Sequence, residues 1–119
     1  MILINLTPHD LALFDHEGKA EIARIPKSGN VARVLTQATE IDSVEVEMHH
    51  VSVVSTEYGK VEGLPEALEE TMYIVSVLVT GALKALEIKR NDVVAPDTGP
   101  QSVVRDADGN ILGVRRFTR

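Results

Sequence analysis

Four arginines lie near the end of this sequence, Arg105, Arg115, Arg116 and Arg119, and a turn-forming segment at residues 97–100 precedes them. Guanidinium groups bind phosphate through charge-assisted, often bidentate hydrogen bonds. A glycine-containing turn can also present backbone N–H groups to an anion. These residue types therefore indicate a site for a small phosphorylated ligand, with contacts from Asp97, Thr98, Arg105, Arg115 and Arg116.

Each of these residues also has a purely structural interpretation. Residues 97–100, Asp-Thr-Gly-Pro, have the composition of an ordinary turn, and the arginines could pair with Asp106 or Asp108. On a strand, Arg115 and Arg116 would point to opposite faces, so only one of them could face a given ligand. We therefore expect Arg115→Ala or Arg116→Ala, but not both, to weaken binding.

Arg33 is a second candidate clamp, because it follows a Ser-Gly-Asn loop and lies between Val31 and Val34. An exposed position on a sheet is the alternative. Asn5, Thr7 and His9 follow the first apolar run of the chain, where polar side chains commonly bond to turn backbone. Contacts with an adenine or a ribose are the other option for these three residues.

The charge is distributed unevenly. Residues 1–72 hold 5 Lys and Arg against 13 Asp and Glu, whereas residues 73–119 hold 7 against 5. The whole chain carries a net charge of -6. Such a chain is poorly suited to DNA or RNA, whose binding depends on many cationic side chains, but a small anion held by a few arginines is compatible with it.

Other function classes lack support in the sequence. The chain contains no cysteine, and its four histidines show no ligand-like spacing, so no metal site and no cofactor is predicted. No GxSxG, Walker, HExxH or GxGxxG pattern occurs, and no catalytic residue is proposed. The N-terminus lacks a signal-peptide pattern, and no apolar run approaches the roughly 20 residues that span a bilayer. We therefore expect a cytoplasmic binding protein rather than an enzyme or a membrane protein.

Alternating and helical hydrophobic patterns define the elements that must position these residues. They predict a single α+β ligand-binding domain over residues 1–119, with a twisted, mainly antiparallel sheet and one principal helix. Residues 59–70 are predicted to form a loop, and residues 35–42 are ambiguous. The predicted strands are 2–6, 11–14, 20–25, 31–34, 43–48, 51–54, 73–75, 102–105 and 111–117, and the predicted helix runs from a Ser76 cap to Ile88.

Two further expectations concern packing. A core built from Val, Ile, Leu and Ala, together with exposed sheet edges, predicts a homo-oligomer. Gly81 lies inside the helical pattern, where glycine costs about 1 kcal/mol relative to alanine, so we expect a close backbone approach at this position.

A series of landmarks covers nearly the whole chain: NLTPHD at 5–10, PKSGNVARV at 26–34, EGLPE at 62–66, YIVS at 73–76, RNDVVAPDTGP at 90–100 and VRDADGNILGVRRF at 104–117. This order resembles small bacteriophage and prophage proteins of the first-described Thoeris anti-defence family. The resemblance implies an oligomeric protein without catalytic activity, which binds the cyclic ADP-ribose isomers made by TIR-domain enzymes. It transfers a function class and no list of ligand residues.

Two hypotheses follow. In the first, the protein is a phage anti-defence protein that sequesters a cyclic ADP-ribose-type signal without cleaving it. In the second, it is a phage structural or regulatory module that binds a protein partner and has no small-molecule ligand.

Overall fold

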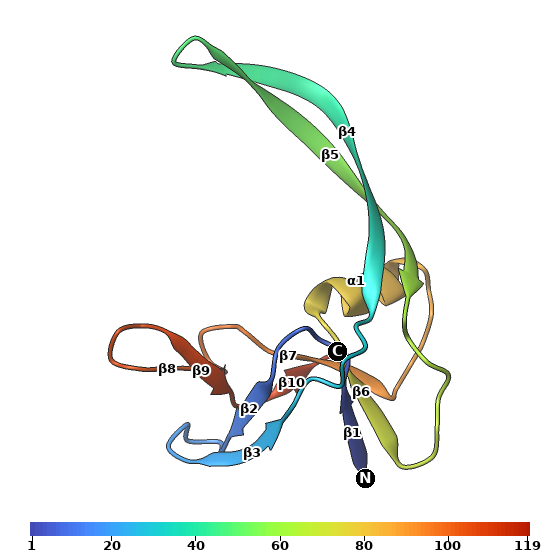
Figure 1. The fold of residues 1–119 in the computed structure, drawn as a ribbon, viewed down its shortest axis with the longest axis vertical. Coiled ribbons are helices and arrows are strands. Elements are labelled where there is room, and N and C mark those ends of the chain that lie inside the picture. The colour runs from blue at the N-terminus through green and yellow to red at the C-terminus, as the bar shows by residue number, and fades with distance from the viewer.

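Three layers make up the body of the protein in the computed structural model, which describes residues 1–119 (Figure 1). A helix covers one face of a central sheet, and a second sheet covers the other face. The central sheet has the strand order β1 (Ile2–Asn5), β6 (Thr71–Ile74), β7 (Val93–Pro96), β10 (Phe117–Thr118), and the second sheet has the order β3 (Glu21–Ile25), β2 (Leu11–Phe14), β9 (Ile111–Val114), β8 (Val103–Arg105).

The apolar run at residues 72–75 forms β6 and its extension at the centre of the body. Tyr73 and Val75 pack against the helix, whereas Ile74 packs against Val94 and Ile25 on the opposite face. Both faces of the strand are therefore buried, which explains why its sequence is continuously apolar rather than alternating.

Helix α1 (Val77–Ala85) follows β6 directly. The Ser76 hydroxyl caps it by accepting a hydrogen bond from the Val79 N–H, as the sequence predicted. The helix ends three residues earlier than expected, because Glu87 adopts a φ of 58° and the Ile88 N–H returns to the Leu83 carbonyl. With nine residues, this one helix is too short to cross a membrane.

The α+β class and the single principal helix are confirmed, but the strand pairing differs from the expected antiparallel order. β1, β6 and β7 are mutually parallel, and β1 does not pair with β2, which belongs to the other sheet. Helix α1 accounts for the β6–β7 pair, because it returns the chain to the same end of the sheet and such a crossover joins parallel neighbours. The crossover between β1 and β6 runs instead through residues 6–70, which include β2 to β5.

A long hairpin projects from the body (Figure 1). We call it the arm; it consists of β4 (Arg33–Val46), β5 (His49–Glu62) and the turn residues Glu47 and Met48. β5 thus includes four residues that the sequence assigned to a loop. Both turn residues have positive φ, 49° and 68°, as a two-residue hairpin turn requires. The radius of gyration, 17.4 Å, exceeds the roughly 13.5 Å of a compact domain of this length because of the arm.

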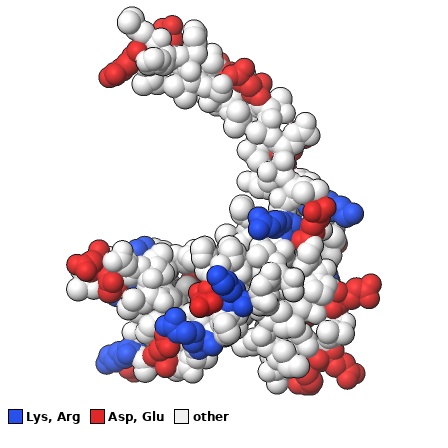
Figure 2. All heavy atoms as spheres, in the orientation of Figure 1, with Lys and Arg blue, Asp and Glu red and all other residues white.

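The arm also explains the uneven charge of the sequence. Five of the 18 acidic residues and none of the 12 basic residues lie in residues 34–59, so this segment carries -5 of the net charge of -6. In Figure 2 the distal part of the arm shows acidic side chains and no basic ones. The acidic character of the first 72 residues is therefore concentrated in the arm.

The close approach expected at Gly81 is absent within one chain. Gly81 is exposed on α1, and a Cβ at this position would meet no atom within 4 Å. We expect Gly81→Ala to raise the free energy of unfolding by about 0.5–1 kcal/mol, because alanine favours helix without a clash. Urea unfolding of dilute protein measures it. As a contrast, Gly63→Ala should destabilise, since Gly63 has a φ of 80° and its Cβ would lie 2.5 Å from the Val31 carbonyl oxygen.

Candidate functional site

The predicted phosphate-binding turn binds its own side chains in the structure. Asp97 accepts hydrogen bonds from the Gly99 N–H at 2.9 Å and from the Arg116 guanidinium. The Arg116 guanidinium and the Gly99 N–H lower the pKa of Asp97 and hold it ionised. The turn therefore presents a carboxylate, and its Gly99 N–H is already bonded to that carboxylate. Both features disfavour the binding of an anion at this turn. Thr98 is exposed next to this pair.

The other predicted ligand residues do not converge on the turn. Arg105 pairs across the β8–β9 hairpin with Ile111, not with Arg115, and donates to the Gly109 carbonyl at 2.7 Å. That hairpin closes through five residues, 106–110. Arg33 is exposed at the base of the arm.

Arg115 and Arg116 do diverge, although neither lies in a strand. Arg115 is half-buried against Gly18, and its Nε has no hydrogen-bond partner. Arg116 is exposed and paired with Asp97. Of the six predicted residues, the structure brings together Asp97, Thr98 and Arg116 at one turn and places the remaining three elsewhere.

Asn5 and Thr7 satisfy backbone rather than forming an open ligand site. The Asn5 amide donates to the carbonyls of His9 at 2.8 Å and Ile25 at 3.0 Å. Its oxygen accepts from the N–H and the hydroxyl of Thr7. Asn5 is 1% exposed, so all four of its hydrogen bonds are made inside the protein. This network fixes the loop between β1 and β2.

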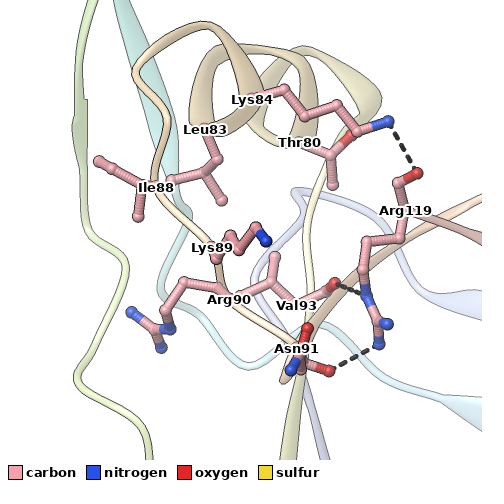
Figure 3. Close-up of a pocket in the computed structure, with 9 residues that line it drawn as sticks. All are labelled: Thr80, Leu83, Lys84, Ile88, Lys89, Arg90, Asn91, Val93 and Arg119. Carbon is pink, nitrogen blue, oxygen red and sulfur yellow. Dashed lines mark hydrogen bonds between the residues drawn. The ribbon is translucent and has the colours of Figure 1, made fainter.

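A different part of the structure gathers positive charge. A pocket of about 380 Å³ lies beside the C-terminal half of α1, which places it in the size range of small-molecule sites. Four of its nine lining residues are cationic and none is acidic. We call it the cationic pocket; it is lined by Thr80, Leu83, Lys84, Ile88, Lys89, Arg90, Asn91, Val93 and Arg119 (Figure 3).

Hydrogen bonds hold the rim of the cationic pocket in place. Arg119 donates to the carbonyls of Asn91 at 2.6 Å and Val93 at 3.2 Å, and Lys84 donates to the main-chain oxygen of Arg119 at 2.8 Å. In Figure 3 the Lys89 side chain points toward the middle of the pocket. The rim thus joins three separate segments: α1, residues 88–93 and Arg119.

The cations differ in how far neighbouring groups neutralise them. Arg90 forms a bidentate pair with Asp92 at 2.8 and 2.9 Å and also donates to the Pro65 carbonyl. Arg119 donates to the neutral carbonyls of Asn91 and Val93 and forms no ion pair, although its charge also acts on Asp92. No ion pair engages the ammonium of Lys89. The C-terminus of α1 contributes only about half a negative charge, so the pocket remains net positive.

The Arg90–Asp92 pair makes a pH-dependent contribution to stability. Hydrogen bonding by the Arg90 guanidinium lowers the pKa of Asp92 below its unfolded value of about 3.9. The pair therefore stabilises the fold above about pH 4, and this stabilisation is lost as the pH falls through the lower, folded pKa.

We accordingly expect Asp92→Asn to reduce the free energy of unfolding by roughly 1.5–3 kcal/mol at pH 7, and by less under strongly acidic conditions. Urea unfolding at pH 7 and under strongly acidic conditions measures the loss of stability. Asp108→Asn on the exposed β8–β9 turn is the control. An equal loss at both pH values would contradict the assignment to the ion pair.

The sequence contains one local signal for the cationic pocket, the adjacent Lys89 and Arg90 just after the helix. Lys84 and Arg119 lie far from each other along the chain, so their proximity has no local signal. No cluster of three or more potential metal ligands occurs in the structure.

Comparison of the chain with protein-family models, with curated proteins and with solved structures finds no significant match in any of the three.

Proposed function

We propose that the protein binds and sequesters a small anionic nucleotide of the cyclic ADP-ribose type in the cationic pocket, without cleaving it. The observation that carries the proposal is the accumulation of Lys84, Lys89 and Arg119 around one cavity whose lining includes no acidic side chain. A pyrophosphate needs compensating positive charge, which lysine supplies as a point charge and arginine as a planar donor.

The remaining lining suits the rest of such a ligand. Ile88 offers exposed apolar surface for a base or a ribose, and Leu83 and Val93 contribute largely buried apolar atoms to the lining, while Thr80 and Asn91 add polar atoms. Small-molecule sites commonly combine an apolar wall with a few orienting polar groups. Together with the resemblance in sequence, this supports a phage anti-defence protein that acts in the cytoplasm of the host cell.

One experiment separates binding from turnover. The protein is incubated with cyclic ADP-ribose isomers, ADP-ribose and cyclic AMP, filtered free of unbound nucleotide, and heat-denatured, and the released compounds are identified by mass spectrometry. Sequestration predicts release of an intact nucleotide in a near-stoichiometric amount. Release of a converted product would instead identify an enzyme.

A second candidate function is a protein-interaction module without a small-molecule ligand, which the exposed arm favours. Thermal shift distinguishes the two. A nucleotide at a hundredfold excess over its Kd should add about 2.7 kcal/mol of stability, whereas a pure interaction module should show no shift with any nucleotide.

A further inference from the structure

The distal half of the arm has one apolar face with nothing packed on it. The pairing of Val44 with Val51 and of Asp42 with Val53 places four valines on the same face, together with Asp42 and His49. We call this the valine face; its valines are Val44, Val46, Val51 and Val53, and each is at least 37% exposed. The opposite face carries Ser43, Glu45, His50 and Ser52.

With valines on one face and polar residues on the other, the hairpin lacks a second layer of structure to cover its apolar face. A two-stranded hairpin with both faces in water is only marginally stable, and it usually needs further strands or a helix on its apolar face. The body of the same chain does not supply that layer, since the distal arm extends away from it (Figure 1). Met48, at the tip, is 92% exposed.

Helix α1 also has an apolar side with nothing packed on it. Its buried side consists of Val79, Thr80, Ala82 and Leu83, but its other side is also apolar. A helix that is apolar all round is normally covered on every side. We define the outer face of α1 as Val77, Leu78, Gly81 and Ala85, which lie on one stripe at helical spacing and are all exposed.

The outer face of α1 is hollowed where it meets the base of the arm. Tyr58 of β5 and the residues of the outer face line a cavity of about 290 Å³. Gly81 contributes no side chain to it, and nothing within one chain requires a glycine there. A hollow apolar surface of this kind can receive protruding aliphatic side chains.

We infer that the valine face of one copy packs on the outer face of α1 in a second copy of this chain. Each copy carries both surfaces, so a two-fold arrangement satisfies both contacts at once. Strands of 14 residues span up to roughly 46 Å, enough for each arm to reach past its own body. Gly81 then provides the close approach between copies that is absent within one.

The negative charge of the arm favours contact with α1 of the second copy over direct contact between two arms. Each arm carries five carboxylates and no cation over residues 34–59, so two arms side by side would repel. α1 contains no acidic residue, and Lys84 follows Gly81 by three positions. An acidic arm therefore finds a better electrostatic partner in the helix than in another arm.

The test compares two matched double variants by light scattering and sedimentation at micromolar concentration. Val44→Asp with Val51→Asp introduces two carboxylates on the valine face, and Ser43→Asp with Ser52→Asp introduces the same charge on the opposite face of the same strands. We expect wild type and the serine variant to have twice the mass of 13.0 kDa, and the valine variant to be monomeric, with association weakened at least about 100-fold. A monomeric wild type, or equal effects of the two variants, would overturn the inference.

A second measurement locates the contact. The chain has no cysteine, so Met48→Cys places a single photo-crosslinker at the arm tip. In a mixture of ¹⁵N-labelled and unlabelled protein, crosslinks between copies should map to α1 or the segment just after it. Crosslinks confined to the other arm would show that arms pack on each other and would refute the contact with α1. Gly81→Leu should give a folded monomer, because it fills the hollow from the outside.

Discussion

Asn5→Asp is expected to lower the free energy of unfolding by roughly 3–5 kcal/mol at pH 7, the scale of leaving a buried charge without a partner. The Asn5 amide is the donor to two carbonyls, those of His9 and Ile25, in a site that is 1% exposed. An ionised aspartate would face both carbonyls with an acceptor. The loss is large because folded proteins are stabilised by only about 5–15 kcal/mol in total.

The pH dependence of this variant identifies the cause. Burial raises the pKa of a carboxyl group, so the new aspartate favours its neutral form in the folded state. The neutral form restores one donor, and the deficit relative to wild type should shrink as the pH falls toward about 4.

Urea unfolding at pH 7 and pH 4 tests the expectation. Asn30→Asp makes the same chemical change on an exposed asparagine and should cost little at either pH. A deficit for Asn5→Asp that does not change with pH would mean that the charge is not the source of the instability.

Lys89→Glu is expected to weaken nucleotide binding at least about 100-fold. Removing a charge-assisted contact costs about 1.5–3 kcal/mol, and the new carboxylate adds repulsion of the phosphates. Lys89 is the informative position because its side chain points into the pocket and takes part in no ion pair of the fold (Figure 3). Its replacement should therefore leave the melting temperature nearly unchanged.

Isothermal titration with the nucleotide recovered in the release experiment measures the loss. Lys19→Glu gives an identical change in net charge on the exposed turn between β2 and β3 and should retain the wild-type affinity. Arg116→Ala should also bind normally, because Arg116 is committed to Asp97. Equal affinity of Lys89→Glu and wild type would show that the ligand does not bind in the cationic pocket. A loss of affinity in Arg116→Ala would instead place the binding site at the turn that contains Asp97.

Local patterns in the sequence predicted most elements of the body, but not β7 (Val93–Pro96). They also predicted one strand over residues 111–117, which the structure divides into β9 and β10 in two different sheets. The apolar run at residues 11–14 predicted β2, the alternation in residues 20–25 predicted β3, and the Ser76 cap with its helical repeat predicted α1. These features depend on neighbours within a few residues, and a single sequence contains that information.

The arm was only partly visible in the sequence. Its distal strands alternate clearly, but residues 35–42 mix polar and apolar types, and β5 continues through Gly59. The turn at Glu47 and Met48 has no glycine or asparagine, although both residues adopt positive φ. Two-residue hairpin turns commonly contain Asn-Gly, so the sequence lacks the usual signal for this turn.

The sequence by itself determined the α+β class, the one capped helix, the absence of cysteine chemistry and the separation of charge along the chain. Only the tertiary structure decided which charged residues lie close together. Asp97 pairs with Arg116 within the predicted turn. Lys84, Lys89 and Arg119, up to 35 positions apart, instead line one pocket. Strand pairing and site assembly depend on contacts between distant segments, and residue types along the chain do not specify which distant segments will touch.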